Sequence, residues 1–226
     1  MSANELYNKI ILDLSSNVYF SVFKFRKRDD CFISQKKGFK RDVMLRHWIE
    51  PGELVVYPIY GIRYDALLNW FKKYSFKSLQ DQKDNYSFGF AGTMLGCKEN
   101  YYKFKLDGSN FKIVWEILLA DIINCLNTTY SNYKTLELAY KNEIEPILSG
   151  EAELPTVGID WAFIDLTLCK IVAPHNYMQF KKIMMQRIEY MHSKDEPNLA
   201  HYYDRLDEIL EYMESLTLEE LEKCKL

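Results

Sequence analysis

The sequence has few glycines and prolines, only 9 and 6 in 226 residues, which is too few for a fibrous or linker-rich chain. It also lacks a large charge of one sign, because 29 Lys and Arg against 32 Asp and Glu leave a net charge of −3. This balance excludes a globally basic nucleic-acid-binding protein. Aromatic residues are plentiful at 15%, whereas disordered chains are poor in them.

Long apolar runs are missing as well. Glu5 and Asp13 interrupt any apolar core of a signal peptide within the first 30 residues. The most apolar stretch, residues 111–126, contains Lys112, Glu116 and Asp121, whereas a membrane-spanning helix needs about 20 mostly apolar residues. We therefore expect a cytoplasmic protein that has no membrane partner.

Cysteine and histidine patterns of a metal or redox site are also absent. The five cysteines, at positions 31, 97, 125, 169 and 224, are odd in number and form no CxxC pair. This spacing predicts reduced thiols rather than a disulfide framework. None of the four histidines lies within four residues of another histidine or of a cysteine. We therefore predict no metal and no cofactor.

Motifs of catalysis and phosphate binding are equally lacking. No G-x-S-x-G elbow occurs, and the spacing of Gly89, Gly92 and Gly96 matches neither the dinucleotide nor the P-loop fingerprint. We assign no catalytic residue. An enzyme whose site is assembled from distant residues stays open as an alternative.

The periodicity of the sequence changes near residue 107. Before it, strand-forming segments separated by short turns are expected at residues 18–28, 31–34, 39–48, 54–60, 86–95 and 101–106. A capped helix over 3–15, a helix over 62–74 and a polar loop over 75–85 complete this part. After it, helices are expected over 111–126, 133–148, 161–172, 177–191 and 199–216, with a short last helix from Thr217.

This pattern predicts an α+β fold. We expect an antiparallel meander sheet in the N-terminal half, covered by helices, and an all-helical C-terminal half. The expected regions are 1–106 and 107–226, packed together as one compact unit. Pro58 lacks an amide donor, so we expect the second half of its strand at a sheet edge or bulge.

Charge is distributed unevenly along the chain. Residues 1–77 carry a net charge of +6 and residues 78–226 carry −9, and the last 32 residues hold 10 acids against 3 bases. The basic front contains Lys24-Phe-Arg-Lys-Arg28, Lys36-Lys37 and Lys40-Arg41, interleaved with Phe23, Phe25, Phe32 and Phe39. Such a segment resembles a stacking platform for single-stranded nucleic acid, although strand alternation favours aromatic rings turned inward and charges turned outward.

Two groups of residues are candidates for binding. The first is rich in Tyr, Trp and Arg, the types enriched at interface hot spots, and consists of Arg46, His47, Trp48, Tyr57, Tyr60, Arg63 and Tyr64. The second lies on the polar face of an amphipathic helix and consists of Asp207, Glu208, Glu211 and Glu214. The alternative interpretations are partly buried sheet residues for the first group and an ordinary solvated face for the second. Asp160 is expected to cap the helix at Trp161.

The N-terminal third resembles a known bacterial family. The capped helix is followed by Phe23-Lys-Phe-Arg-Lys-Arg28, Cys31-Phe-Ile33 and Gly38-Phe39, and then by a meander that ends in a helix. Over residues 3–75 this order resembles uncharacterised α+β domains found among immunity proteins, which neutralise secreted polymorphic toxins. The resemblance implies a binding protein without catalysis.

Together these observations favour a protein-interaction protein, of the immunity-inhibitor type implied by the resemblance. Its acidic C-terminal part predicts a cationic protein partner, because opposite charge steers association. A nucleic-acid-binding module that uses the basic sheet is the alternative from a different class.

Overall fold

A computed structural model describes residues 1–153, 158–194 and 199–224. The chain forms two compact units, each built from two stretches of sequence. The sheet unit comprises Met1–Ile62 and Phe88–Ser131, and the helical unit comprises Arg63–Ser87 and Asn132–Leu226. We expected a boundary between residues 106 and 107. The long helix after that point instead belongs with the sheet, and the segment 63–87 belongs with the helices.

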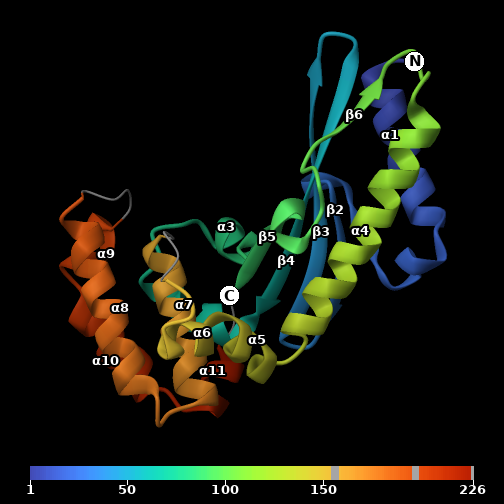
Figure 1. Ribbon diagram of the computed structural model, residues 1–226. Helices are drawn as coiled ribbons and strands as arrows, with labels where there is room; N and C mark the ends of the chain where they lie inside the picture. Colours follow the sequence, from blue (N-terminus) through green and yellow to red (C-terminus); the bar gives the residue numbers. More distant parts are fainter. Residues whose placement is uncertain (154–157, 195–198, 225–226) are drawn as a thin grey trace. The chain divides into compact units, whose positions relative to one another are not determined.

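The sheet has six strands, in the order β1-β2-β3-β4-β5, with β6 also paired to β4 (Figure 1). Their bounds are β1 Lys24–Arg26, β2 Cys31–Lys36, β3 Phe39–Glu50, β4 Glu53–Tyr64, β5 Phe88–Ala91 and β6 Tyr102–Lys105. The β1–β2, β2–β3, β4–β5 and β4–β6 pairs are antiparallel. The tight turns before β3 and β4 place Gly38 and Gly52 at φ 73° and 79°, where a side chain would be strained. The expected antiparallel meander is thus confirmed.

The expected strand over residues 18–28 is mostly wrong. Only β1 is extended, and it lies between two 3-10 helices, η1 (Val18–Val22) and η2 (Lys27–Asp29). The Asn17 side chain accepts a hydrogen bond from the Tyr19 amide at 2.9 Å and so starts η1. After η2 the chain reverses through Asp30, whose φ of 48° is left-handed. Local side-chain capping therefore overrides the strand propensity of this segment.

Pro58 lies at a gap in the hydrogen bonding of β4. The β6 pairing ends at Val56, opposite Tyr102, and the β5 pairing begins at Ile59, opposite Ala91. Two short strands therefore follow one another along the same edge of β4, and Pro58 falls between them. β4 is internal rather than at a sheet edge, and the missing amide donor lies where no partner strand needs it.

One face of the sheet packs against α1 (Ala3–Ser16) and α4 (Phe111–Tyr133) (Figure 1). The predicted capping box of α1 is present, with Ser2 and Glu5 each accepting from the other's backbone amide. The predicted helical face of α1 is buried, as are the alternating positions of the strands. Fully buried residues of this core include Leu6, Ile10 and Leu14 of α1, Val43 and Leu45 of β3, Leu54 and Val56 of β4, and Leu118 and Ile122 of α4.

The helical unit consists of short and medium helices. They are α2 Asp65–Leu68, η3 Asn69–Lys73, α3 Leu79–Asp84, α5 Leu136–Glu143, α6 Glu145–Ser149, α7 Ile159–Val172, α8 Tyr177–His192, α9 Ala200–Tyr203, α10 Leu206–Ser215 and α11 Leu218–Lys223. Among the described residues, no helix is long and apolar enough to cross a membrane.

Several helix boundaries differ from expectation. The polar segment 75–85, expected as a loop, contains α3, because the Ser78 hydroxyl accepts from the Asp81 amide and caps it. The expected helix over 133–148 is broken between α5 and α6, next to Pro146. The expected helix over 199–216 is broken at Arg205.

Aromatic side chains dominate the core of the helical unit. The Phe71 ring lies 4.9 Å from the Phe163 ring and 5.2 Å from the Tyr202 ring, measured between centroids. Trp70 contacts Phe163 edge to face at 6.2 Å. Helix α7 supplies the central apolar segment, since eight consecutive residues from Ala162 to Cys169 are buried.

Candidate interaction surface

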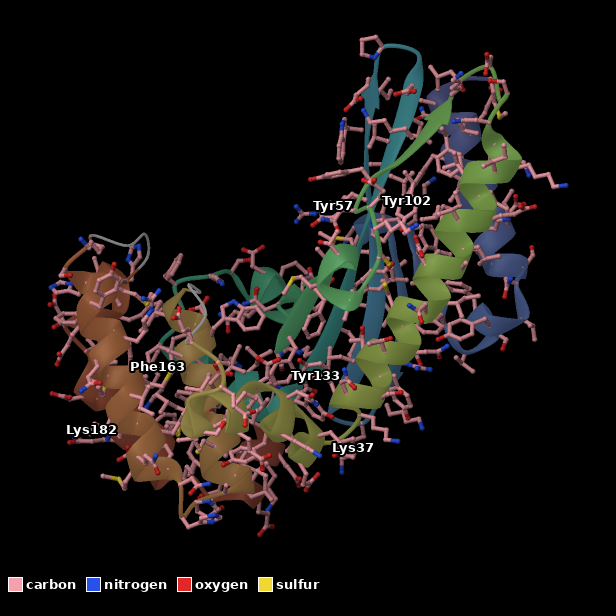
Figure 2. The ribbon with its side chains drawn as sticks, viewed as in Figure 1. Lys37, Tyr57, Tyr102, Tyr133, Phe163 and Lys182 are labelled. Carbon is pink, nitrogen blue, oxygen red and sulfur yellow. The ribbon has the colours of Figure 1, made fainter. Side chains whose placement is uncertain are left out.

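Three aromatic residues form a cluster on the sheet unit: Trp48 of β3, Tyr57 of β4 and Tyr101, which immediately precedes β6. The Tyr101 ring lies 5.6 Å from Trp48, edge to face, and 5.0 Å from Tyr57. Trp48 is 40% exposed and Tyr101 is 50% exposed. Tyr57 projects from the face of the sheet opposite α4, whereas Tyr102 points toward that helix (Figure 2). We call these three residues the aromatic cluster.

Glu50 fixes the orientation of the cluster from the end of β3. Its carboxylate accepts a hydrogen bond from the Trp48 indole at 3.2 Å and forms an ion pair with Lys103 at 2.6 Å. The hydrogen bonds from Lys103 and Trp48 lower the pKa of Glu50. The aromatic rings are therefore held by strands and side-chain bonds, rather than by a free loop.

The first predicted group does not form one surface. Arg46 is exposed and shares the strand face of Trp48, because residues two apart on a strand point the same way. His47 points to the opposite face and stacks on Tyr7, with ring centroids 3.8 Å apart. Tyr60 is 1% exposed and belongs to the core of the sheet unit. Strand alternation, which a list of residue types ignores, separates these positions.

Arg63 and Tyr64 of the same group are structural residues of the helical unit. Arg63 is 4% exposed and donates to the Asp65 carboxylate, the carbonyls of Gln82 and Asn85, and the Asn69 side chain, at 2.5 to 3.0 Å. The buried hydroxyl of Tyr64 donates to the Tyr133 carbonyl at 2.6 Å. The Arg63 contacts tie α3 to the segment that follows β4, and the Tyr64 contact ties the end of β4 to Tyr133. Neither side chain is therefore available to a partner.

A cleft of about 440 Å³ lies on the His47 side of the sheet unit. Its lining includes Tyr7, Asn8, Lys27, Asp30 and His47. The Tyr7 hydroxyl donates to the Leu45 carbonyl at 3.1 Å, and burial together with Asp30 raises the pKa of Tyr7. His47 Nδ1 lies 3.7 Å from the Asp30 carboxylate, which is too long for a hydrogen bond. His47 and Asp30 therefore lie near each other in this cleft without a hydrogen bond between them.

The four acidic residues of the second group have different surroundings. Asp207 and Glu211 are exposed on α10. Glu208 is exposed and forms an ion pair with Arg205 at 3.0 Å. Glu214 is half-buried and accepts from Lys181 at 2.5 Å and from Tyr177 at 2.6 Å. Glu214 is thus part of the internal bonding of the helical unit, while Asp207 and Glu211 remain the best candidates for a charged surface.

Other acidic residues of the C-terminal part also have different surroundings. Glu219 forms an ion pair with Lys223 at 2.5 Å, and Glu220 caps α11 through Thr217. Asp195 and Glu196 lie outside the described residues.

The basic segment of the sheet unit is partly neutralised. Arg26 and Arg28 both form ion pairs with Asp29, and the buried Lys40 pairs with Asp42 at 3.2 Å. The interleaved rings turn toward the core, where Phe32 contacts Phe20 at 5.0 Å and Phe25 at 4.8 Å. None of these four rings is an open platform for a base, since Phe32 is fully buried and Phe23, Phe25 and Phe39 are half-buried.

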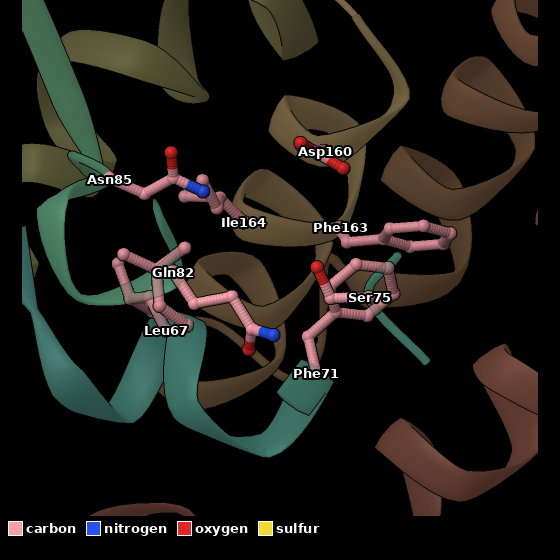
Figure 3. Close-up of a pocket in the computed structure, with 9 residues that line it drawn as sticks. Leu67, Phe71, Ser75, Gln82, Asn85, Asp160, Phe163 and Ile164 are labelled. Atoms are coloured by element: carbon pink, nitrogen blue, oxygen red, sulfur yellow. The ribbon is translucent and has the colours of Figure 1, made fainter. Parts of the chain in front are cut away.

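The helical unit contains a small cavity between α7 and the segment that carries η3 and α3 (Figure 3). Ser75, Gln82, Asn85 and Asp160 contribute polar atoms to its lining, and its volume is about 20 Å³. That volume suits about one water molecule rather than a substrate. Asp160 does not cap α7 as we expected: Gly158 occupies the capping position, and Asp160 forms an ion pair with Lys77.

Within the described residues, no three His, Cys, Asp or Glu side chains are grouped so that they could hold a metal ion.

Sequence reasoning found two members of the aromatic cluster and missed Tyr101 with its neighbours Glu50 and Lys103. Tyr101 carries no signal of its own in the sequence, because only the β4–β6 pairing, in which Val56 lies opposite Tyr102, brings it beside Tyr57. No family model, curated protein or solved structure matches this chain, so the aromatic cluster and the acidic residues of α10 are assigned from geometry alone.

Proposed function

We propose that this chain is a non-catalytic protein-interaction protein that docks a partner protein on the aromatic cluster. The observation that carries the proposal is the contact of the Tyr101 ring with both Tyr57 and Trp48, at 5.0 and 5.6 Å, on a surface where Trp48 and Tyr101 stay 40% and 50% exposed. Large aromatic rings that stay this exposed present apolar surface area that a partner can bury on binding.

The restraint of the cluster side chains favours tight binding of a partner. Tyr and Trp have only two side-chain torsions, and here those torsions are restrained by ring contacts and by the Glu50–Trp48 hydrogen bond. Little conformational entropy is then lost when a partner binds. Arg46, exposed on the same strand face, adds the third residue type enriched at hot spots.

A cationic partner is favoured by the charges of α10. Asp207 and Glu211 are exposed carboxylates, and Glu208 beside them is compensated by Arg205 and by the charge of Lys73. Negative charge of this kind speeds the encounter with a positively charged protein and slows the approach of nucleic acid. A secreted toxin domain neutralised in the cytoplasm is the partner class that the resemblance of residues 3–75 implies.

The test starts from a partner identified by co-purification from the native cell and then reconstituted from two purified proteins. Trp48→Ala and Tyr101→Ala remove cluster rings that are not part of the core. We expect each to weaken binding by about 2 kcal/mol, which corresponds to roughly a 30-fold higher Kd. Tyr190→Ala is the matched control, because Tyr190 is an aromatic residue of similar exposure, 53%, on α8.

Equal affinities for all three variants and the wild type would refute the aromatic cluster as the docking surface. A second outcome would replace the proposal with the nucleic-acid alternative. That outcome is binding of oligonucleotides at physiological salt, lost on neutralising Arg26, Lys27 and Arg28, with an affinity that falls steeply with salt.

A further inference from the structure

Two thiols that are far apart in sequence lie in contact within the sheet unit. The Sγ atoms of Cys97 and Cys125 are 3.1 Å apart, although 28 positions separate the residues. Cys125 belongs to α4 and is fully buried, whereas Cys97 is half-exposed in the loop between η4 (Gly92–Leu95) and β6. Both are thiols in the structure.

The loop that carries Cys97 is held in place by its own hydrogen bonds. The Cys97 amide donates to the Gly92 carbonyl at 3.0 Å. The Asn100 side chain closes the loop by accepting from the Thr93 amide at 2.8 Å and donating to the Thr93 hydroxyl at 3.0 Å. A Cβ atom at Gly92 would lie 3.4 Å from both the Cys97 Cβ and the Glu99 carbonyl oxygen, so the loop packs closely against Gly92. The position of Cys97 against α4 is therefore built into the loop.

We propose that Cys97 and Cys125 are a site of thiol–disulfide exchange, whose substrate is a low-molecular-weight disulfide such as oxidised glutathione. A protein disulfide has an S–S distance of about 2.05 Å, so the two sulfurs need to approach by only about 1 Å. This inference is independent of the proposed docking function.

The reaction proceeds by two exchanges. The accessible Cys97, as thiolate, attacks one sulfur of oxidised glutathione, which gives a Cys97–glutathione mixed disulfide and releases one glutathione thiolate. Cys125 attacks the Cys97 sulfur, forms the Cys97–Cys125 bond and expels the second glutathione as a thiolate, which takes up the proton of Cys125. Two protein thiols are oxidised, one small disulfide is reduced to two glutathione molecules, and the released protons balance the released thiolates.

The surroundings of the two thiols slow their oxidation but do not prevent it. Burial raises the pKa of Cys97 and raises the pKa of Cys125 to about 12, so few of the thiols are ionised at neutral pH. The side chains around the pair, Tyr60 of β4, Tyr102 of β6 and Asp121 of α4, supply no positive charge that would stabilise a thiolate. Oxidation should therefore take place over hours and respond to sustained oxidising conditions.

The experiment counts thiols in the full-length protein. Native protein is incubated with oxidised glutathione at pH 8, then denatured, alkylated and mapped by mass spectrometry. We expect two of the five cysteines to be protected, with one peptide pair linking Cys97 to Cys125 within a monomer. The loop closed by this bond should raise the apparent Tm by roughly 5–10 °C.

Variants separate the proposed pair from ordinary thiol reactivity. Cys224→Ser removes the other half-exposed cysteine and should leave the protection of two cysteines unchanged. Cys97→Ser should abolish the linked peptide pair. Cys125→Ala should instead accumulate the Cys97–glutathione adduct; Cys97→Ser still decides the question if this core variant does not fold. Five free thiols after complete incubation, or a linkage between any other two cysteines, would overturn the proposal.

Discussion

Arg63 donates to the side-chain oxygen of Asn69 at 2.5 Å, and Asn69 in turn donates through its amide to the carbonyl of Cys224 at 3.0 Å. The first residue of the helical unit is thereby linked to Cys224 at the end of α11, 155 positions beyond Asn69. Burial lowers the pKa of Arg63, and the hydrogen bond and charge of Asp65 oppose that effect. The guanidinium therefore stabilises this unit only as long as all of its acceptors remain in place.

Replacing Arg63 with methionine should strongly destabilise the protein. The change leaves the buried carbonyl of Gln82 and the Asn69 side chain without their donor, and we expect a loss of about 2–4 kcal/mol in the free energy of unfolding. Arg63→Lys should recover only part of this loss, because an ammonium group cannot reproduce the planar fork. Urea unfolding measures both, with Arg46→Met as the exposed control. Similar unfolding midpoints for Arg63→Met and Arg46→Met would contradict the structural role.

Lys170 should contribute measurably to stability through the end of α10. Its ammonium group donates to the carbonyls of Met213, Glu214 and Leu216 at 2.5–2.7 Å, and these groups lie where a helix leaves its carbonyls unpaired. We expect Lys170→Met to lower the free energy of unfolding by about 1–2 kcal/mol.

The control for Lys170 is Lys182→Met, which changes an exposed lysine of α8 (Figure 2). Amide hydrogen exchange should also accelerate in the last turn of α10 in Lys170→Met alone. Equal exchange rates there in both variants would show that Lys170 does not cap the helix.

Asp165 should make the protein less stable as pH rises. It is buried in α7, and burial together with the charge of Glu143 raises its pKa well above the usual range for a carboxyl group. The folded state therefore holds a proton that the unfolded state releases above about pH 4. The stability that this group contributes is fully present below its unfolded pKa and is lost as pH rises toward its folded pKa, by at most about 1.4 kcal/mol per pH unit.

Asp165→Asn removes the ionisable group while it keeps the shape of the side chain. Its free energy of unfolding, relative to the wild type, should rise progressively with pH above about pH 4 in urea titrations. Asp204→Asn, at an exposed carboxylate, is the matched control. A difference between Asp165→Asn and the wild type that stays constant with pH would contradict the burial of an ionisable proton at Asp165.

The charge of α10 should control the rate of association with a cationic partner. Asp207→Lys combined with Glu211→Lys should slow association several-fold at low salt. The effect should be much smaller at about 0.5 M salt, because screening by salt limits electrostatic attraction to short distances. Glu151→Lys combined with Glu153→Lys introduces the same change in net charge elsewhere. If both double variants slow association equally, only the net charge matters and α10 has no special role.

The sequence was sufficient for elements whose own pattern determines them. The capping box at Ser2, the periodic face of α1 and the strands around Gly38 and Gly52 all formed as expected, because local geometry and burial favour the same structure there. Residues 18–28 were misjudged, since hydrogen bonding at Asn17 competes with the intrinsic preference for a strand.

Relationships between distant residues could not be predicted in this way. Arginine is a residue type that is enriched at interface hot spots, and only the fold shows that the Arg63 side chain is bonded to the carbonyls of Gln82 and Asn85. Tyr57 and Tyr101 come together through a pairing between β4 and β6, and Cys97 meets Cys125 through the packing of a loop on α4. Such contacts depend on which segments become neighbours in the fold.

The gap at Pro58 has a consequence for how copies of the protein behave in solution. Since β5 and β6 share one side of β4, each is only four residues long, and β1 on the opposite border of the sheet has three. A strand from another molecule that tried to extend the sheet along β5 and β6 would find only four consecutive strand residues on either side of the gap. The interruption thus guards a sheet with two twelve-residue central strands against growth into aggregates.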